Sequence, residues 1–460
     1  MYSIDYWIVF IYLFLILVMG LLAGRGIKSL EGFAVAGRNY TTLIIFATLS
    51  ASFIGGGFTM GNAEKVFILG IVNIFALWGF SLKEILVASF IAPRMDRFSG
   101  VISVGDIMGR SYGKPGQIVA GFFGVLLCSG IVGAQVGAMG YVFNVMVGLD
   151  FVWGILIGCG IVIAYSTVGG MRAVVVTDIL QFVVLGIGIP LTLFFGIEAA
   201  GGWEAVKTAV PLERFSPFGG MALPTFASLF LTFLLGETLV PPYVQRLLIG
   251  KNASHTSKGT LLSGIFSFPF FVITGSIGLV ALALKPDLDP NLALPFVVQQ
   301  TLPWGLKGLV VAGIISVVMS SADSFLNSAA VAFCNDLINP LRRVPLTARA
   351  QLWLAKLINL MVGVLAVIFA LKIKSILDIL IYAYNFWSPV ILPPLLAALF
   401  GVRTRPLVFI CGSLAGFCGV WLWKYGLHAP GGIDGLVVGV LCNTAVFLLG
   451  WRISAKAEKK

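Results

Sequence analysis

The sequence has very little charge for its length. Only 11% of its 460 residues are charged, against about a quarter in an ordinary soluble domain, and 59% are hydrophobic. The mean hydropathy is +1.02. Water cannot be the main solvent of such a chain, which excludes a soluble globular domain.

Histidine and cysteine supply no pattern of catalytic groups or metal ligands. The sequence has two histidines, His255 and His428, both predicted to lie in loops, and no nucleophile and base pair. Its six cysteines fall within apolar stretches, without the spacing of a metal site or a disulfide framework. We therefore do not expect an enzyme, and we interpret the cysteines as packing residues.

Apolar stretches of about 20 residues dominate the sequence. A helix needs this length to cross a bilayer, whereas a barrel strand needs only about 9 to 11 residues. We therefore expect an all-α integral membrane protein, a single domain over residues 1–460 with about 13 transmembrane helices. The predicted spans are about 5–24, 40–61, 68–92, 117–147, 151–168, 174–198, 224–245, 260–284, 305–335, 351–371, 377–400, 407–425 and 431–451.

The net charge of +11 comes from basic residues scattered over short loops. Such scatter indicates membrane topology and no nucleic-acid partner. Lys and Arg concentrate in alternate loops, such as those with Arg94, Arg246 and Arg342, and in the tail from Arg452. Because basic loops stay in the cytoplasm, the pattern predicts a multi-pass cell-membrane protein with its N-terminus outside and its C-terminus inside.

Three consecutive glycines, Gly55 to Gly57, lie within the second predicted span. Glycine weakens a helix, and nothing in lipid would replace the lost backbone hydrogen bonds. A break here is tolerable where it faces a cavity, in which free carbonyls can bind a cation or a solute. The alternative is close helix packing through small residues.

A second interruption comes five spans later, in the run Leu235-Gly-Glu-Thr-Leu-Val-Pro-Pro242. Interrupted helices at corresponding positions of two halves are typical of transporters with inverted repeats. We predict five-helix repeats at residues 40–198 and 224–400, with one peripheral helix at 5–24 and two at 407–451.

The ninth span contains the run Val-Val-Met-Ser-Ser-Ala-Asp-Ser. At helical spacing, Ser320, Ser324 and Asn327 share one face, flanked by Ser321 and Asp323. Sodium is a hard cation that needs about five oxygen ligands, which hydroxyls and carbonyls can supply. The alternative is that these serines bond to their own helix.

Charged residues also fall within other predicted spans. An intramembrane carboxylate is costly unless it is paired, so Asp178 is a functional candidate. If Asp178 and Asp323 lie close together, a cation or a shared proton must lie between them. Glu237, beside the second break, could bind a positive or hydroxylated group or cap the helix. For Lys83, Glu84 and Lys356 we expect snorkelling or structural pairing.

In these segments the sequence resembles the sodium:solute symporter family, over nearly its whole length. The most specific matches are Gly-Gly-Met-Arg-Ala-Val-Val-Val-Thr-Asp-Ile-Leu-Gln at 169–181 and Met-Ser-Ser-Ala-Asp-Ser at 319–324, supported by Tyr-Val-Gln-Arg at 243–246 and Trp-Ser-Pro at 387–389. The resemblance implies a core of two inverted five-helix repeats. It also implies sodium-driven import of a small organic solute by alternating access.

The resemblance also implies site residues. The main sodium site would use the carbonyls of Ala51, Ile54 and Val317 and the hydroxyls of Ser320 and Ser321. A second cation site found in some members would map onto Asp178, Ser320, Asp323 and Ser324, with Asp323 in place of a hydroxyl of some relatives.

Among branches of the family, the segments Ser-Phe-Ile-Gly-Gly-Gly at 52–57, Tyr-Val-Gln-Arg and Met-Ser-Ser-Ala-Asp-Ser look most like the choline-transporter branch. That branch surrounds a quaternary ammonium with tryptophans. The matching positions here are Phe53, approximately Ile131, and Val240, so only one aromatic residue remains. The solute site is expected at Phe53, Gly55, Gly56, Phe80, Glu237 and Val240.

Two alternatives stay open at this point. A proton-coupled symporter of the same fold would rely on Asp178 and Asp323 in place of the serines. A transporter-shaped membrane sensor is a second alternative, although the short basic tail offers no output domain.

Overall fold

The computed structural model describes residues 1–53, 55–344, 346–372 and 376–457. This part of the chain is helical, and its one isolated bridge joins Tyr40 to Gly250. The expected all-α fold is therefore confirmed. Nine of the described helices are long and apolar enough to cross a membrane, and a tenth span results if the bent pair α3 and α4 counts as one. The total of 13 stays a prediction.

The elements alternate long helices with short helical segments. The α-helices are α1 Ser3–Ala23, α2 Leu30–Val35, α3 Thr42–Phe53, α4 Gly56–Leu69, α5 Val72–Leu86, α6 Val104–Val142, α7 Phe151–Ala199, α8 Trp203–Ala209, α9 Leu223–Leu235, α10 Pro241–Leu248, α11 Ala253–Leu284, α12 Ala293–Thr301, α13 Leu306–Val331, α14 Asn339–Leu341, α15 Ala348–Lys372, α16 Ile376–Leu399, α17 Pro406–Trp421 and α18 Gly435–Ala457. The π and 3-10 segments are η1 Val87–Ile91, η2 Ala92–Phe98, η3 Phe143–Val147, η4 Leu212–Phe215, η5 Pro290–Leu292, η6 Ala332–Ile338, η7 Leu422–Gly426 and η8 Pro430–Gly432.

Helix α7 contains a sharp kink that divides it into two spans. Its 49 residues would extend about 74 Å as a straight helix, more than twice the hydrocarbon core of a bilayer. At Gly170 the backbone takes a φ of 45°, a conformation that favours glycine, and an added Cβ would lie 2.6 Å from the Phe33 carbonyl oxygen. The chain therefore turns back here, close to the boundary predicted between the fifth and sixth spans.

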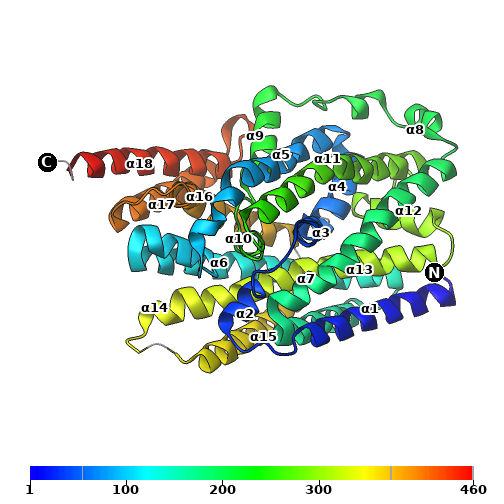
Figure 1. Cartoon of the computed structure of the whole chain (residues 1–460). Coiled ribbons are helices and arrows are strands. Elements are labelled where there is room, and N and C mark those ends of the chain that lie inside the picture. Colours follow the sequence, from blue (N-terminus) through cyan, green and yellow to red (C-terminus); the bar gives the residue numbers. More distant parts are fainter. Residues whose placement is uncertain (54, 345, 373–375, 458–460) are drawn as a thin grey trace.

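Helix α13 lies at the centre of the bundle (Figure 1). Of its most apolar window, 94% is buried, whereas the corresponding value is 28% for α1 and 33% for α15 and α17. Helices α6, α7 and α1 pack against α13. Because α13 is enclosed by protein, its polar side chains need protein partners or bound ions, not lipid.

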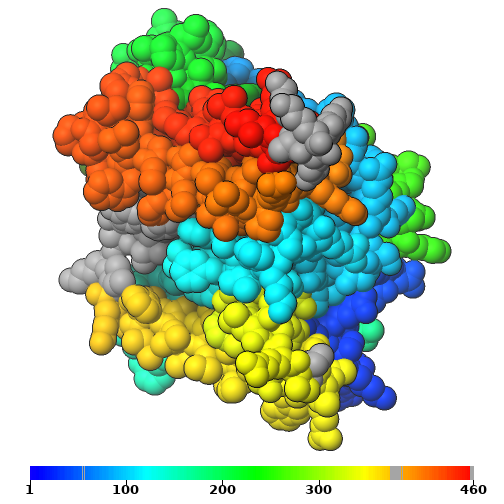
Figure 2. Space-filling view, turned by 90° about the vertical axis from the view of Figure 1, so that its left-hand side faces the viewer, coloured from blue at the N-terminus to red at the C-terminus, as the bar shows by residue number. Residues whose placement is uncertain are grey.

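The peripheral helices cover the two sides of this centre. Figure 1 shows α1 and α15 on one side and α17 and α18 on the other. The start of α1 and the end of α18 lie at opposite ends of the bundle. Figure 2 views the end where α18 finishes and shows the same layering, with α17 and α18 above the cyan α6 and the yellow segments below it.

Candidate ion and solute site

The second predicted span is interrupted in the structure, as its three glycines predict. Helix α3 ends at Phe53, α4 begins at Gly56, and the two helices are inclined by 46° to each other. A Cβ added to Gly55 would lie 2.6 Å from the Ser321 hydroxyl oxygen, so the break sits directly against α13. Ala51 is fully buried one turn before the break. Ile54 falls outside the described residues.

The polar run of α13 lies inside the bundle. Val317, Ser320, Ser321, Asp323 and Ser324 are all buried, with at most 6% of each residue exposed. The Ser324 hydroxyl donates to the carbonyl oxygen of Ser320 at 2.7 Å, which is the helix-bonded alternative raised for these serines. The Ser320 hydroxyl instead donates to Asp178 Oδ1 at 2.6 Å.

Asp178 has a complete set of partners. Its Oδ2 accepts hydrogen bonds from the Thr48 hydroxyl and from Arg246 Nη2, the latter at 2.9 Å. Both Asp178 and Arg246 are fully buried, and Arg246 Nε also donates to Thr48 at 3.0 Å. Residues of α3, α7, α10 and α13 thus meet in one network of ionic and hydrogen bonds.

Asp323 is joined to this network through a serine. One of its oxygens accepts a hydrogen bond from the Tyr165 hydroxyl, and the other lies 3.0 Å from the Ser324 hydroxyl oxygen, whose single proton is donated to the Ser320 carbonyl. Ser324 in turn accepts from Arg246 Nη2 at 2.7 Å. The guanidinium group of Arg246 therefore bonds directly to Asp178 and is linked to Asp323 through Ser324.

The placement of Arg246 corrects the sequence analysis. The charge pattern predicted Arg246 in a cytoplasmic loop, but Arg246 lies in α10 with no exposed surface. The loop rule counts basic residues near span ends, and it cannot distinguish a topology signal from an arginine that a buried carboxylate holds. The available signal was that Arg246 follows the uncharged run Pro-Pro-Tyr-Val-Gln directly.

The second predicted interruption is also present. Helix α9 ends at Leu235 and α10 begins at Pro241, and Leu239 between them has a φ of 55°. The hydroxyl of Ser388 on α16 lies within hydrogen-bonding distance of the carbonyl oxygens of Leu235, at 2.8 Å, and Gly236, at 2.7 Å. These are carbonyls that the helix break leaves without intrahelical partners. No sequence pattern predicted this role for Ser388.

A cavity of about 60 Å³ lies between the two breaks and α13. Its lining residues are Ser52, Gly55, Gly57, Phe58, Ile131, Gln135, Glu237, Pro242, Tyr243, Arg246, Ser321, Ser324 and Phe325. Two of the predicted solute contacts, Gly55 and Glu237, are among them. The cavity also shares Ser321 with the predicted sodium site, so an ion and a solute would be neighbours here.

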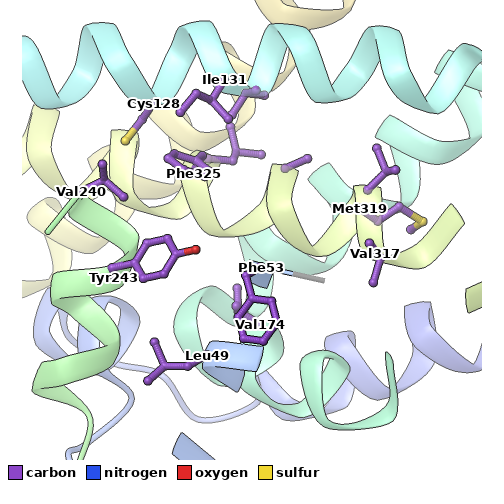
Figure 3. Close-up of a cluster of buried hydrophobic side chains, with 14 of the residues drawn as sticks. Leu49, Phe53, Cys128, Ile131, Val174, Val240, Tyr243, Val317, Met319 and Phe325 are labelled. Atoms are coloured by element: carbon purple, nitrogen blue, oxygen red, sulfur yellow. The ribbon is translucent and has the colours of Figure 1, made fainter. Parts of the chain in front are cut away.

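Three of the other predicted solute contacts lie behind the residues that line the cavity. Phe53, Phe80 and Val240 are fully buried and do not line the cavity, and Gly56 begins α4 between two glycines that do. Phe53 packs edge-on against Phe80, at 5.5 Å between ring centroids. Figure 3 shows the Tyr243 ring pointing into a region that Ile131 and Phe325 border on one side, with Phe53 on the other side.

Comparison with known proteins identifies this arrangement. A model of the sodium:solute symporter family matches residues 33–416, which include both breaks and α13. The chain belongs to the sodium:solute symporter family. It is thus a transporter and not an enzyme, a multi-pass membrane protein in which sodium is the coupling ion for symport of a small organic solute. Sodium coupling is thereby favoured over the proton-coupled alternative.

Related proteins support this assignment over most of the chain. The high affinity choline transporter 1 of Homo sapiens is 26% identical over 440 residues, which cover 89% of this chain and 74% of that protein. The sodium/glucose cotransporter 1 of Oryctolagus cuniculus is 25% identical over 471 residues, covering 90% of this chain and 70% of the relative.

Solved structures share the fold. A sodium-coupled sialic acid symporter in a substrate-bound outward-open state superposes with a TM-score of 0.86 at 18% identity, covering 98% of both chains. A nucleobase-cation-symport-1 transporter in a closed conformation gives 0.61 at 15% identity, with 92% of this chain and 95% of that chain covered. These likenesses confirm the transporter fold that the sequence motifs implied.

Proposed function

We propose that the coupling sodium ion binds where the α3–α4 break meets α13. Its ligands are the carbonyls of Ala51, Ile54 and Val317 and the hydroxyls of Ser320 and Ser321. The observation that carries this proposal is the close approach of Gly55 to the Ser321 hydroxyl. The chain just after the end of α3 therefore lies against Ser321, where backbone and hydroxyl oxygens can supply the ligands that a hard monovalent cation needs.

Asp178 orients one of these ligands. The Ser320 hydroxyl donates its proton to Asp178 Oδ1, so both lone pairs of its oxygen stay free to face a cation. The carboxylate also adds negative potential near the ion. Because Arg246 neutralises part of that charge, the site has less net negative charge than a site for a divalent cation, which suits sodium.

Arg246 takes the position proposed for a second cation. Its guanidinium contacts Asp178 and Ser324, two of the four residues of that predicted site, and the Ser324 hydroxyl oxygen lies 3.0 Å from another, Asp323. We infer that a single sodium ion accompanies each solute molecule in this protein. Asp178, Asp323 and Ser324 then hold Arg246 in place of a second sodium.

The cavity places the solute beside the ion. Gly55 and Ser321 belong to both regions, so sodium that fixes the break also shapes the cavity wall. Coupling needs only that ion and solute each favour the other's conformation, by about 1 to 3 kcal/mol. Choline, glucose and sialic acid, the solutes in the names of similar proteins, illustrate the size class.

The two breaks support the inverted repeats proposed for residues 40–198 and 224–400. One interrupted helix, α3 with α4, begins the first repeat, and the other, α9 with α10, begins the second. Half-helices of this kind place their ends at the membrane midplane and let each repeat move as a body during alternating access.

Replacing Ser320 or Ser321 by alanine tests the sodium site. Each change removes one of about five oxygens, so we expect the half-saturating sodium concentration for solute uptake to rise about tenfold or more. The measurement is uptake into proteoliposomes over a series of sodium gradients. The parent curve should be hyperbolic if one sodium ion is coupled.

Ser316→Ala is the matched control, because this serine lies on the same helix but bonds to Tyr12 and to the Gly313 carbonyl. Its sodium dependence should match the parent protein. Equal sodium activation in all three variants would rule out the proposed ligands.

We also propose that the N-terminus is outside and the C-terminus cytoplasmic. The termini lie at opposite ends of the bundle, and α14, which precedes the basic loop with Arg342 and Arg343, lies at the same end as the last turn of α18. A cysteine at exposed Lys207 should react in intact cells with a membrane-impermeant maleimide, whereas one at exposed Lys251 should react only after lysis. The reverse pattern would invert the topology.

A further inference from the structure

A buried ion pair lies behind the cavity wall. Lys83 and Glu84 are adjacent on α5, their side chains are each 3% exposed, and Lys83 Nζ lies 2.7 Å from Glu84 Oε1. Of the two expectations for these residues, pairing is confirmed. Apart from this ion pair, neither Lys83 Nζ nor Glu84 Oε2 has a hydrogen-bond partner among the residues that the structure describes. The pair therefore keeps unused donors and an unused acceptor in an apolar region.

The ammonium group rests on aromatic rings. Lys83 Nζ lies 3.6 Å from the ring centroid of Phe80 and 4.5 Å from that of Tyr243. An aromatic surface of this kind binds ammonium ligands through the negative face of each ring. Here the protein occupies the surface with its own cation, so a cationic solute would meet competition and repulsion.

One layer of aromatic side chains separates Lys83 from the cavity. Tyr243 lines the cavity, as does Phe58, which packs on Phe80 at 4.9 Å between centroids. Phe58 follows the first helix break and Tyr243 follows the second. At 60 Å³ the cavity is well below the roughly 300 Å³ at which ligand pockets begin, so it must widen to admit an organic solute. Movement at the breaks would displace Tyr243, which contacts Lys83, and Phe58, which packs on Phe80.

We propose that the solute carries a carboxylate group and that Lys83 binds it when the cavity opens. This inference rests on the proposed function and names the solute class of that site. A carboxylate supplies the acceptors that the ammonium lacks in the closed cavity. Glu237, which accepts from the Tyr243 hydroxyl at 3.4 Å, suits a donor group at the other end of the solute. A zwitterion of amino-acid type fits both ends.

Uptake of five labelled compounds tests the solute class. Proteoliposomes with an inward sodium gradient are offered choline, glycine betaine, L-proline, pyruvate and D-glucose. Choline and glycine betaine share a trimethylammonium group and differ in the carboxylate. We expect sodium-driven uptake of at least one of the three carboxylates and of neither choline nor glucose. Uptake of choline or glucose, or of none of the carboxylates, would overturn the proposal.

Variants of the pair separate binding from structure. The double variant Lys83→Gln/Glu84→Gln removes both charges and leaves no unpaired ion in the bilayer. We expect it to raise the half-saturating concentration of the transported carboxylate about tenfold or more, while Lys83→Arg keeps most of the affinity. If the pair is only structural, the double variant will transport like the parent protein, and the proposal is wrong.

Measuring sodium binding in the absence of solute tells whether the proposed role of Lys83 fails or the proposed sodium site fails. Sodium should raise the melting temperature of the double variant as it does that of the parent protein, since Lys83 is not among the proposed ligands. If sodium no longer raises the melting temperature of the Ser320→Ala and Ser321→Ala variants but still raises that of the double variant, the sodium site is supported independently of the solute. If the double variant keeps the parent's affinity for the carboxylate and sodium still raises its melting temperature, the proposed role of Lys83 is wrong but the sodium site stands.

Discussion

Replacing Arg246 by glutamine should destabilise the protein by about 3 to 5 kcal/mol, because Asp178 would keep a buried negative charge without its cation. The guanidinium also bonds to Thr48 and Ser324, so its loss disconnects residues of three helices from one another. We expect a lower melting temperature in detergent and little or no solute uptake. Light-scattering or fluorescence melting of purified protein measures the first effect.

The double variant Asp178→Asn/Arg246→Gln is the informative control. It removes both charges, so it should recover much of the stability that the single variant loses. Arg343→Gln, at an exposed position, should melt like the parent protein. An Arg246→Gln protein as stable as the Arg343→Gln protein would show that the buried pair contributes nothing.

The second large effect is expected from Gly55→Ala. The backbone at Gly55, with a φ of −45° and a ψ of 166°, accepts an L-residue, so the change acts through space alone. The new Cβ would lie 2.6 Å from the Ser321 hydroxyl oxygen, which must then rotate away or be pushed back with α13. Either movement removes a proposed sodium ligand, and we expect sodium-dependent uptake to fall at least about tenfold.

Gly61→Ala is the matched substitution on α4. Nothing lies within 4 Å of a Cβ at Gly61, so this variant should fold and transport normally. The comparison also includes melting temperatures, because the Gly55→Ala protein should remain folded while sodium no longer stabilises it. Sodium stabilisation that survives in Gly55→Ala would mean that Ser321 does not bind the ion.

The network around Asp178 gives these predictions a common basis. Asp178 meets Thr48 on α3, Ser320 on α13 and Arg246 on α10, so it connects both interrupted helices to the central one. A change in sodium occupancy at Ser320 therefore reaches α10, whose first turn forms part of the cavity wall. This is a contiguous physical route by which ion and solute sites can influence each other.

The interrupted helices were predictable from the sequence because the cause is local. The run Gly55 to Gly57 weakens its own helix, and Pro241 and Pro242 cannot continue the helix before them. The serine stripe of α13 was equally readable, since helical periodicity alone places Ser320 and Ser324 on one face. The structure agrees at each of these positions.

Partners from distant segments were not predictable in this way. Arg246 bonds to Asp178 across 68 positions, and Ser388 meets the Leu235 carbonyl across 153. No periodicity or composition links such pairs. The rule that assigns basic residues to cytoplasmic loops gave a wrong prediction for Arg246. Arginine usually lies in water, but here the ion pair with Asp178 holds it inside the bundle.

The sequence by itself determined the membrane environment, the helical fold, the two breaks and the oxygen-rich stripe, since hydropathy and backbone flexibility belong to each segment separately. Only the tertiary structure decided which charges neutralise each other, which side chains line the cavity and which lie behind its wall. The physical reason is that desolvation in the bilayer makes an unpaired charge costly, so each buried ion takes whichever partner the packing of several helices brings within reach.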